Sequence, residues 1–315
     1  MEIEQKTLEG KKGGRGLQVF VTGATGFVGH EVVRQLVAKG HTPHCLVRPG
    51  SEGKMRAIQG VEVCHGDVNT PETLAQAMQG CEAIIHLVGI IREFPGRGVT
   101  FARLHTEATK NMIAAAQKTG ITRYLQMSAN GTRAKAVSDY HRSKWAAEEA
   151  LRASTLDWTI FRPSMIIGSK SEFVKMLAEQ IRLLPIVPVI GHGRYPMTPV
   201  ALEDVAASFV TALEMPQSIK ETYHCGGRDT CSYDEILDLV GAALGKGRVR
   251  KLHHPVCLIR PVITLLEGIP AFPITRNQLT MLLEGNRCDS SAWQETFGLK
   301  PKPLKELLSA ALTPP

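Results

Sequence analysis

The stretch that decides the fold is LQVFVTGATGFVGHEVVRQLVAKG, residues 17–40, in which an apolar run enters a glycine-rich turn. Val19, Phe20 and Val21 are β-formers in an unbroken run, which is typical of a strand buried on both faces. From residue 27 onward, apolar residues recur at helical spacing until Gly40 ends the run. The stretch therefore predicts a strand, a turn and a helix, in that order.

The turn itself is suited to an anion. Gly23, Gly26 and Gly29 have the spacing GxxGxxG. Glycine permits positive φ and lets the backbone approach a ligand closely. The N-terminus of the following helix offers unpaired N–H groups and the positive end of the helix dipole. In a strand–turn–helix unit this combination predicts the pyrophosphate site of a dinucleotide, and a purely structural tight turn is the alternative.

The composition is that of an ordinary globular protein. The chain has 315 residues, of which 43% are hydrophobic and 21% charged, enough for a doubly wound domain and a smaller second one. Its net charge of +7 is spread along the chain, so a phosphate-bearing ligand explains part of it and no nucleic-acid partner is predicted. Apolar runs long enough to cross a membrane are interrupted by charge or proline. The polar residues 1–16 are expected to be a disordered leader, not a signal peptide.

The cysteines and histidines predict neither disulfides nor a metal site. The seven cysteines are scattered without a CxxC pair, which favours a reduced, cytoplasmic location. Two groups of histidine and cysteine, at 41–45 and 253–257, lack a second pair at the spacing of structural zinc sites. We interpret both groups as surface or half-buried side chains.

Strands alternate with helices through the first half of the chain. Apolar strands are predicted at 41–47, 61–67, 82–89, 122–128 and 157–163, with helices at 71–79, 102–120 and 138–154. This order is typical of an α/β fold, a Rossmann-type doubly wound parallel sheet with helices on both faces, here at 17–164.

Beyond residue 164 prolines break the alternation. A helix at 201–215 and a strand at 222–227 are predicted to return to the sheet, so that 201–227 belongs with the first domain. The remaining segments, 165–200 and 228–315, are predicted to form a small, partly discontinuous substrate domain.

The end of the second strand indicates which nicotinamide cofactor is bound. An acidic residue there would repel a 2′-phosphate, but this chain has Arg48, followed by Ser51 and Lys54. We therefore expect NADP(H) to be favoured over NAD(H), unless Arg48 is an ordinary exposed arginine. Asp67 follows the third strand, where it is placed to accept a hydrogen bond from the adenine amino group or to form a turn.

A tyrosine and a lysine stand four residues apart in YHRSK, at Tyr140 and Lys144. On a helix these positions share a face, and a nearby cation is expected to lower the pKa of the phenol. Tyr140 is therefore a candidate proton donor or acceptor for a substrate oxygen. The YxxxK pattern is common by chance, and its value here is its position after the fifth strand.

Several short motifs together resemble a known family. GATGFVG, GDV at 66–68, HLVG at 86–89, MSANG at 127–131, YHRSK and FRPSMIIG at 161–168 resemble the atypical, extended-like short-chain dehydrogenase/reductases. The resemblance covers about residues 17–312. It is strongest to the branch of the NAD(P)H-binding accessory subunit of complex I and its bacterial relatives, often described as NAD-dependent epimerase/dehydratase-like.

The resemblance implies roles for particular residues. Tyr140 would be the acid/base, Lys144 would bind the nicotinamide ribose, and Ser128 is the candidate for the serine beside the substrate oxygen. The implied cofactor-binding residues are Gly23, Thr25, Gly26, Phe27, Val28, Arg48, Asp67, Val68, Leu87, Val88, Gly89, Lys144 and Pro163.

The chain also departs from the family's pattern. Ser128 stands a few residues early, so that Asn130 or Gly131 would take the active position. The segment from Ser128 to Tyr140 is short, and RPSM at 162–165 lacks the asparagine of sugar-nucleotide epimerases, which argues against epimerisation.

Two functions follow from these observations. One is an NADPH-dependent oxidoreductase acting on an apolar carbonyl or quinone-like small molecule, which the Tyr140–Lys144 pair favours. The other is a non-catalytic holder of NADPH, structural or redox-sensing, like the complex I subunit or the NmrA-like regulators, which the displaced serine favours.

Residues 255–274, PVCLIRPVITLLEGIPAFPI, have a high aliphatic content but are interrupted by Arg260, Glu267 and four prolines. They are therefore not expected to span a bilayer. One interpretation is a short helix and loop in the core of the small domain. The other is an apolar cover over the nicotinamide end that contacts a membrane surface or a protein complex.

Overall fold

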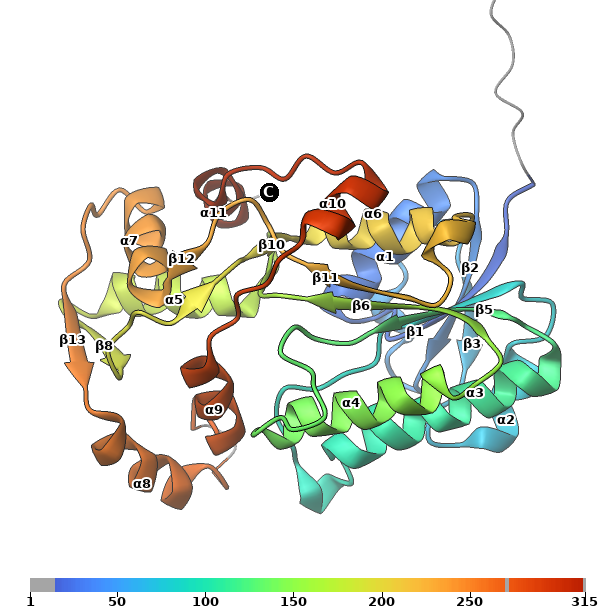
Figure 1. Cartoon of the computed structure of the whole chain (residues 1–315), viewed down its shortest axis with the longest axis horizontal. Helices are drawn as coiled ribbons and strands as arrows, with labels where there is room; N and C mark the ends of the chain where they lie inside the picture. Colours follow the sequence, from blue (N-terminus) through green and yellow to red (C-terminus); the bar gives the residue numbers. More distant parts are fainter. Residues whose placement is uncertain (1–14, 270–271, 314–315) are drawn as a thin grey trace, which may run out of the picture.

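A parallel sheet of seven strands forms the centre of the computed structural model, which describes residues 15–269 and 272–313 (Figure 1). The strand order is β11-β6-β5-β4-β1-β2-β3, and every pair in it is parallel. The predicted Rossmann-type fold is confirmed. The strands are β1 (Gln18–Thr22), β2 (Thr42–Val47), β3 (Glu62–His65), β4 (Ala83–His86), β5 (Arg123–Met127), β6 (Asp157–Pro163) and β11 (Glu221–Cys225).

Helices cover both faces of this sheet (Figure 1). One face carries α1 (Phe27–Ala38), α6 (Leu202–Ala212) and α10 (Ser291–Phe297). The other carries α2 (Pro71–Ala77), α3 (Ala108–Thr119) and α4 (Asp139–Arg152).

The first strand shows why its apolar run is unbroken. Val19 and Val21 pack in the hydrophobic cluster on the α1 side, whereas Phe20 packs in the cluster on the α3 side. All three are completely buried. Because successive side chains of a strand point to opposite faces, a strand covered on both sides needs an apolar residue at every position.

A third hydrophobic cluster lies beyond the sheet and joins α5 (Glu172–Leu183), α7 (Tyr233–Ala243) and α11 (Leu304–Leu312). These helices come from the two segments assigned to a small domain, although the division into domains stays a prediction. Trp293 of α10 instead packs on the α1 side of the sheet, where its indole N–H donates to the Ser208 hydroxyl at 2.8 Å.

Three short strand pairs and two further α-helices lie outside the central sheet and the three clusters. The pairs are β7 (Ile166–Ile167) with β10 (Val200–Ala201), β8 (Val187–Ile190) with β13 (Lys251–His254), and β9 (Pro196–Met197) with β12 (Cys231–Ser232). The helices are α8 (Val256–Leu266) and α9 (Arg276–Glu284), which lie at the lower left of Figure 1.

Two sequence predictions fall partly outside the described residues: positions 1–14 of the expected leader, and positions 270–271 of the 255–274 segment. Within 15–269 and 272–313, no helix is long and apolar enough to cross a membrane.

Candidate functional site

The three glycines of the turn serve three different purposes. Gly23 has φ +75°, and a Cβ there would lie 3.0 Å from the backbone of Leu87. A Cβ on Gly29 would lie only 2.1 Å from the carbonyl oxygen of Gly23, so this glycine lets helix and turn pack closely. Gly26 is the exposed N-cap of α1, where a Cβ would meet that same oxygen at a milder 3.1 Å. Gly26 is therefore the one of these three glycines that is exposed.

The N-terminus of α1 presents free amides. The first hydrogen bond of the helix runs from His30 N–H to the Gly26 carbonyl at 3.0 Å, so the N–H groups of residues 27–29 have no acceptor within the helix. The first turn contains no acidic residue. Burial and the charge of Lys170 lower the pKa of His30, and the charge of Glu31 acts in the opposite direction. A diphosphate fits this combination of free amides, positive charge and an exposed glycine.

Arg48 follows β2 with its side chain exposed, and it makes no side-chain hydrogen bond or ion pair within 15–269 and 272–313. The nearby Glu52 carboxylate accepts from Gly50 N–H at 2.9 Å and lies 3.4 Å from His65 Nδ1. Asp67 Oδ1 accepts from the backbone and side-chain N–H groups of Asn69, so this residue forms a turn. Its other carboxylate oxygen accepts no hydrogen bond from the described part of the chain.

Lys144 lies between the carboxyl ends of β4 and β5. Its Nζ donates to the carbonyl oxygens of Val88 at 3.3 Å and Met127 at 3.2 Å. A Cβ on Gly89 would lie 2.9 Å from this Nζ, so Gly89 leaves room for the ammonium group. The side chain is fully buried, and burial lowers the pKa of Lys144 to about 8.

Tyr140 is enclosed by aromatic rings. Its ring contacts those of Phe101, His105 and His141 edge-on, with centroids 5.2–5.7 Å apart. Met281 of α9 joins the same cluster. Burial raises the pKa of Tyr140 to about 12, so the expected lowering by the lysine is wrong for this structure. The physical reason is that desolvation dominates, and the phenol is protonated at neutral pH.

Two buried histidines escaped the sequence analysis. His105 lies in a π-helical segment, Ala102–Glu107, that precedes α3 within the predicted 102–120 helix. Its Nε2 accepts from Ile90 N–H at 3.0 Å, so Nδ1 carries the proton toward Ser143 Oγ at 2.7 Å. His86 bonds Thr22 Oγ1 at 2.6 Å.

Burial and the charge of Lys144 lower the pKa of His105 to about 2 and that of His86 to about 3. Both imidazoles are uncharged at neutral pH, so Lys144 carries the positive charge of this buried group. His105 lies in a π-helical turn, whose residue spacing differs from that of the α-helix predicted over 102–120.

The structure gives Ser128 and its neighbours mainly structural contacts. Ser128 is buried, with its hydroxyl 3.4 Å from Thr132 Oγ1. The Asn130 side-chain N–H donates to Asn286 Oδ1 at 2.8 Å, and Asn130 Oδ1 accepts from His224 Nδ1 at 2.9 Å. These bonds commit the Asn130 amide to the packing of distant segments.

Gly131 has φ +88°, and a Cβ there would lie 2.9 Å from the ring of His141. Pro163 is buried at the end of β6, where its carbonyl accepts from Asn130 N–H at 2.9 Å. Neither Asn130 nor Gly131 therefore presents a side-chain group to a substrate in this structure.

Three side-chain contacts join the α8–α9 hairpin to the Rossmann domain. The Arg92 guanidinium donates to the backbone carbonyls of Glu267, Ile269 and Phe272 at 2.5–3.0 Å. Asp139 N–H donates to Asn277 Oδ1 at 2.9 Å. Finally, Glu284 pairs with Arg133 and lies 3.5 Å from His141 Nδ1.

A cavity of about 480 Å³ lies between the loop after β4 and the α8–α9 connection, beside Tyr140. Its lining includes Phe101, Asp139 and three arginines, Arg92, Arg97 and Arg276. The cover over Tyr140 comes from α9 and not from α8, whose one buried residue is Ile263. Since α8 buries only Ile263, the core interpretation is wrong for this helix, and the residue that packs on Tyr140 comes from α9. Contact of the 255–274 segment with a membrane surface or a protein complex stays a prediction.

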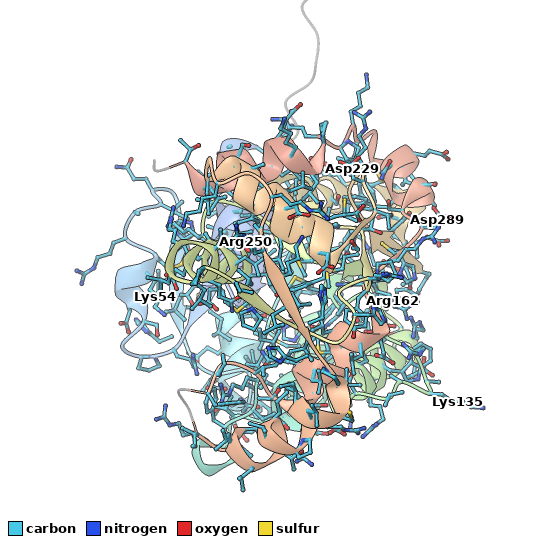
Figure 2. The ribbon with its side chains drawn as sticks, turned by 90° about the vertical axis from the view of Figure 1, so that its left-hand side faces the viewer. Lys54, Lys135, Arg162, Asp229, Arg250 and Asp289 are labelled. Atoms are coloured by element: carbon cyan, nitrogen blue, oxygen red, sulfur yellow. The ribbon has the colours of Figure 1, made fainter. Side chains whose placement is uncertain are left out.

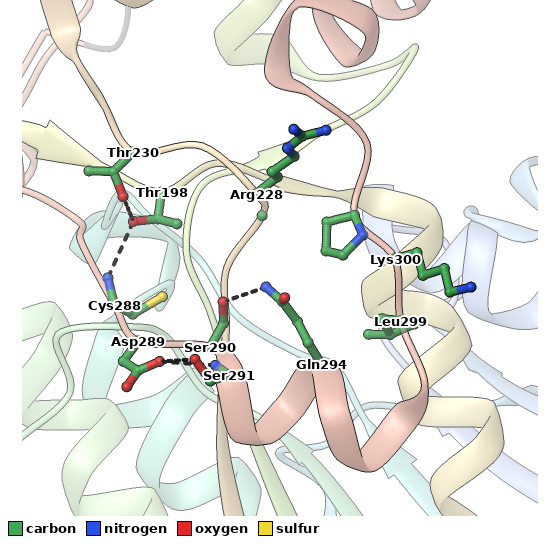
Figure 3. A pocket seen from close by; sticks show the side chains of 12 residues that line it. Thr198, Arg228, Thr230, Cys288, Asp289, Ser290, Ser291, Gln294, Leu299 and Lys300 are labelled. Atoms are coloured by element: carbon green, nitrogen blue, oxygen red, sulfur yellow. Dashed lines mark hydrogen bonds between the residues drawn. The ribbon is translucent and has the colours of Figure 1, made fainter.

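A second cavity, of about 560 Å³, contains none of the predicted site residues (Figure 3). It lies beside α10, and its polar side chains bond one another: Thr198 with Thr230, and Ser290 with Gln294. The glycine turn, Tyr140 and Lys144 line neither of these two cavities, although Asp139, next to Tyr140 in the chain, lines the first.

The comparison with protein families shows which family the chain belongs to. Residues 23–216 match the family model described as NAD(P)H-binding. The chain belongs to the NAD(P)H-binding family. The resemblance inferred from the motifs is confirmed, including its complex I accessory-subunit-like relatives.

Two relatives and one solved structure illustrate the range of this family. Subunit 9 of the alpha subcomplex of mitochondrial NADH dehydrogenase [ubiquinone] 1 from Arabidopsis thaliana is 29% identical over 288 residues, 88% of this chain and 71% of that protein. Ceramide reductase of Caulobacter vibrioides is 31% identical over 239 residues, 75% of this chain and 74% of that protein. The crystal structure of gox2253 superposes with a TM-score of 0.73 at 26% identity, covering 93% of this chain and 96% of that one.

Proposed function

We propose that this protein is an NADPH-dependent reductase of a carbonyl or quinone-like group carried by an apolar molecule, with Tyr140 as the proton donor. The observation that carries the proposal is that a protonated, buried phenol and a buried ammonium group stand four residues apart on α4, with the ammonium at the carboxyl ends of β4 and β5. In doubly wound folds, ligands bind at the carboxyl ends of the strands.

The residues at these strand ends fit a dinucleotide. The proposed cofactor contacts are the glycine turn and free amides of α1 for the diphosphate, Arg48 for the 2′-phosphate, Asp67 for the adenine and Lys144 for the nicotinamide ribose. The other proposed cofactor contacts are Thr25, which lies beside the turn, and Val68, Leu87, Val88, Gly89 and Pro163. Bound NADPH supplies the hydride.

In reduction, Tyr140 donates its phenolic proton to the carbonyl oxygen. Its pKa of about 12 keeps the proton in place until charge develops on that oxygen. The Lys144 ammonium stabilises the phenolate that remains, because opposite charges attract strongly in a buried site. The phenyl ring of Phe101 and the thioether of Met281 exclude water on the substrate side.

The surroundings of Tyr140 support an apolar substrate. Phe101, Ala129, Ile90 and Met281 share its hydrophobic cluster. One relative bears the name ceramide reductase, which is consistent with a long-chain ketone. The cytoplasm is the proposed location, and it is supported by seven cysteines that are all free.

A non-catalytic NADPH holder is the second candidate, and the serine position favours it. The Ser128 hydroxyl is buried near Thr132, and the Asn130 amide is committed to structural bonds. A relative that is a subunit of NADH dehydrogenase is consistent with this function.

Replacing Tyr140 separates the two candidates. NADPH oxidation is followed by absorbance with a panel of long-chain ketones and quinones. We expect turnover by the natural chain, and Tyr140→Phe to lower it about a hundredfold with NADPH affinity unchanged. Tyr233→Phe, a remote tyrosine on α7, is the matched control and should leave turnover intact. Tight NADPH binding without turnover on any of these compounds would favour the holder.

A further inference from the structure

Exposed apolar side chains are concentrated at one end of the molecule. Among the described residues, eleven large hydrophobic side chains are exposed, and eight of them come from the end of α5, the β8–β13 pair and α8. This end lies away from the central sheet at the left of Figure 1, and Figure 2 looks directly onto it. We call it the apolar end; its members are Leu183, Leu184, Ile186, Leu252, Leu258, Val262, Leu265 and Ile269.

Helix α8 supplies three of these residues in a single stripe, and Ile269 follows in the turn after it. Leu258, Val262 and Leu265 stand at steps of four and three and are exposed by 66%, 46% and 82%. Residues at this spacing share one face of a helix. A helix with an apolar face turned outward is typical of an element that lies on a membrane or against a partner.

The β8–β13 pair turns a second apolar group outward. Lys251 and His253 of β13 bond Asp238 and Asp234 of α7, at 2.7 and 2.9 Å. Because side chains alternate along a strand, Leu252 points away from α7. It lies opposite Pro188 of β8, which is also exposed.

Most charges around this end are positive, and its acidic neighbours are paired: Asp238 with Lys251, Asp234 with His253, and Glu267 with Arg276. Segments 182–194 and 246–266 contain seven arginines and lysines and no aspartate or glutamate. Within the described ranges, ion pairing in these segments involves Lys251 and His253 alone. All five arginines of these segments are exposed and form no ion pair with the described residues. They are Arg182, Arg194, Arg248, Arg250 and Arg260, of which Arg250 is labelled in Figure 2.

We propose that the apolar end docks on a bilayer surface that contains anionic lipids. The apolar stripe enters the boundary between headgroups and acyl chains, and the arginines contact the lipid phosphates. Charge complementarity favours this partner over a second copy of the chain, because two copies would bring arginines of like charge together. The proposal does not rest on the proposed reaction, because the exposed side chains of Leu258, Val262 and Leu265 lie outside the cavity near Tyr140.

Vesicle flotation of the full chain tests the proposal. Vesicles of phosphatidylcholine alone are compared with vesicles that also contain phosphatidylglycerol, at low and high salt. We expect binding to the anionic vesicles at least tenfold stronger than to the neutral ones, with a marked loss in high salt. Absence of binding to anionic vesicles, or equal binding to both, would overturn the proposal.

Two variants with matched controls locate the contact. Leu258→Glu/Leu265→Glu and Arg248→Glu/Arg250→Glu should each lower anionic-vesicle binding at least tenfold. Val63→Glu, on an exposed valine of β3, and Lys118→Glu/Lys305→Glu, on exposed lysines elsewhere, should leave it unchanged. All variants should retain NADPH affinity, which shows that they fold. Vesicle binding that persists in both test variants would overturn the proposal. Self-association of the natural chain in sedimentation experiments, abolished by these substitutions, would assign this end to a second copy of the chain instead.

Discussion

The glycine turn and the α8–α9 hairpin are both required for the proposed site, but they are held in different ways. The turn is fixed by backbone geometry within a few residues, since Gly23, Gly26 and Gly29 contact one another's main chain. The hairpin is held by side chains such as Arg92, which bonds carbonyls 175–180 residues away along the chain. The comparison shows that the cofactor half is determined locally, whereas the substrate half depends on long-range contacts.

The largest expected effects come from substituting, one at a time, the two glycines at the start of α1, Gly29 and Gly26. Gly29→Ala should destabilise the fold by about 3 kcal/mol, because the new Cβ would strike the Gly23 carbonyl oxygen. Gly26→Val should leave much of the fold but abolish NADPH binding, because its side chain would occupy the space of the diphosphate. Thermal denaturation and fluorescence titration measure the two effects. Micromolar NADPH binding by folded Gly26→Val would show that the turn is only structural.

Arg48 provides a test of which nicotinamide cofactor the site prefers. We expect NADPH to bind about tenfold more tightly than NADH, because the guanidinium can form two charge-assisted hydrogen bonds to the 2′-phosphate. Arg48→Asp should reverse this preference, and Arg56→Asp, on a nearby exposed arginine, should not. Equal affinities of the natural chain for the two cofactors would contradict the assignment.

Arg92 tests the substrate half in the same way. Arg92→Met removes the donors to three carbonyls at the end of α8 while keeping the length of the side chain. Amide hydrogen exchange in α8 and α9 should become several-fold faster, with NADPH affinity unchanged. Unchanged exchange would mean that the contacts of Asn277 and Glu284 suffice to hold the hairpin.

The smallest expected effect is a pH dependence from Lys144. Its pKa of about 8 lies below the usual value, so the ammonium is charged below pH 8 and neutral well above it. NADPH affinity should therefore fall a few-fold as pH rises through 8, because a neutral amine binds the ribose less strongly. Titrations from pH 6 to 10 measure this, with Lys144→Met expected to bind weakly and without that pH step. A step of equal size in Lys144→Met would assign it to another group.

The fold and the position of the glycine turn could be predicted from the sequence alone. Alternation of strands and helices, and the apolar run at 19–21, depend on local periodicity, which a single sequence records directly. The strand order then follows the usual doubly wound pattern. Strand ends were less certain: the predicted 82–89 strand stops at His86, because residues 87–89 turn toward Lys144.

The chemistry of the site could be predicted only in part. The spacing of Tyr140 and Lys144 indicates a shared helix face, but the pKa of the phenol depends on Phe101 and Met281, which come from distant segments. His105 was missed because it enters through a π-helical turn. Arg92, in a loop of ordinary composition, gives no sequence signal for its contact with the end of α8.

Label transfer in a single turnover tests the central claim, reduction by bound NADPH, most directly. The protein is first loaded with NADPH deuterated at C4. It is then mixed, in the absence of oxygen, with the long-chain ketone that is reduced fastest in the absorbance assay, or with several such ketones together. We predict one deuterium at the carbinol carbon of the product, in an amount that matches the bound cofactor, and about a hundredfold slower transfer in Tyr140→Phe. Absence of deuterated product while NADPH stays bound would contradict the account and leave a protein that only holds its cofactor.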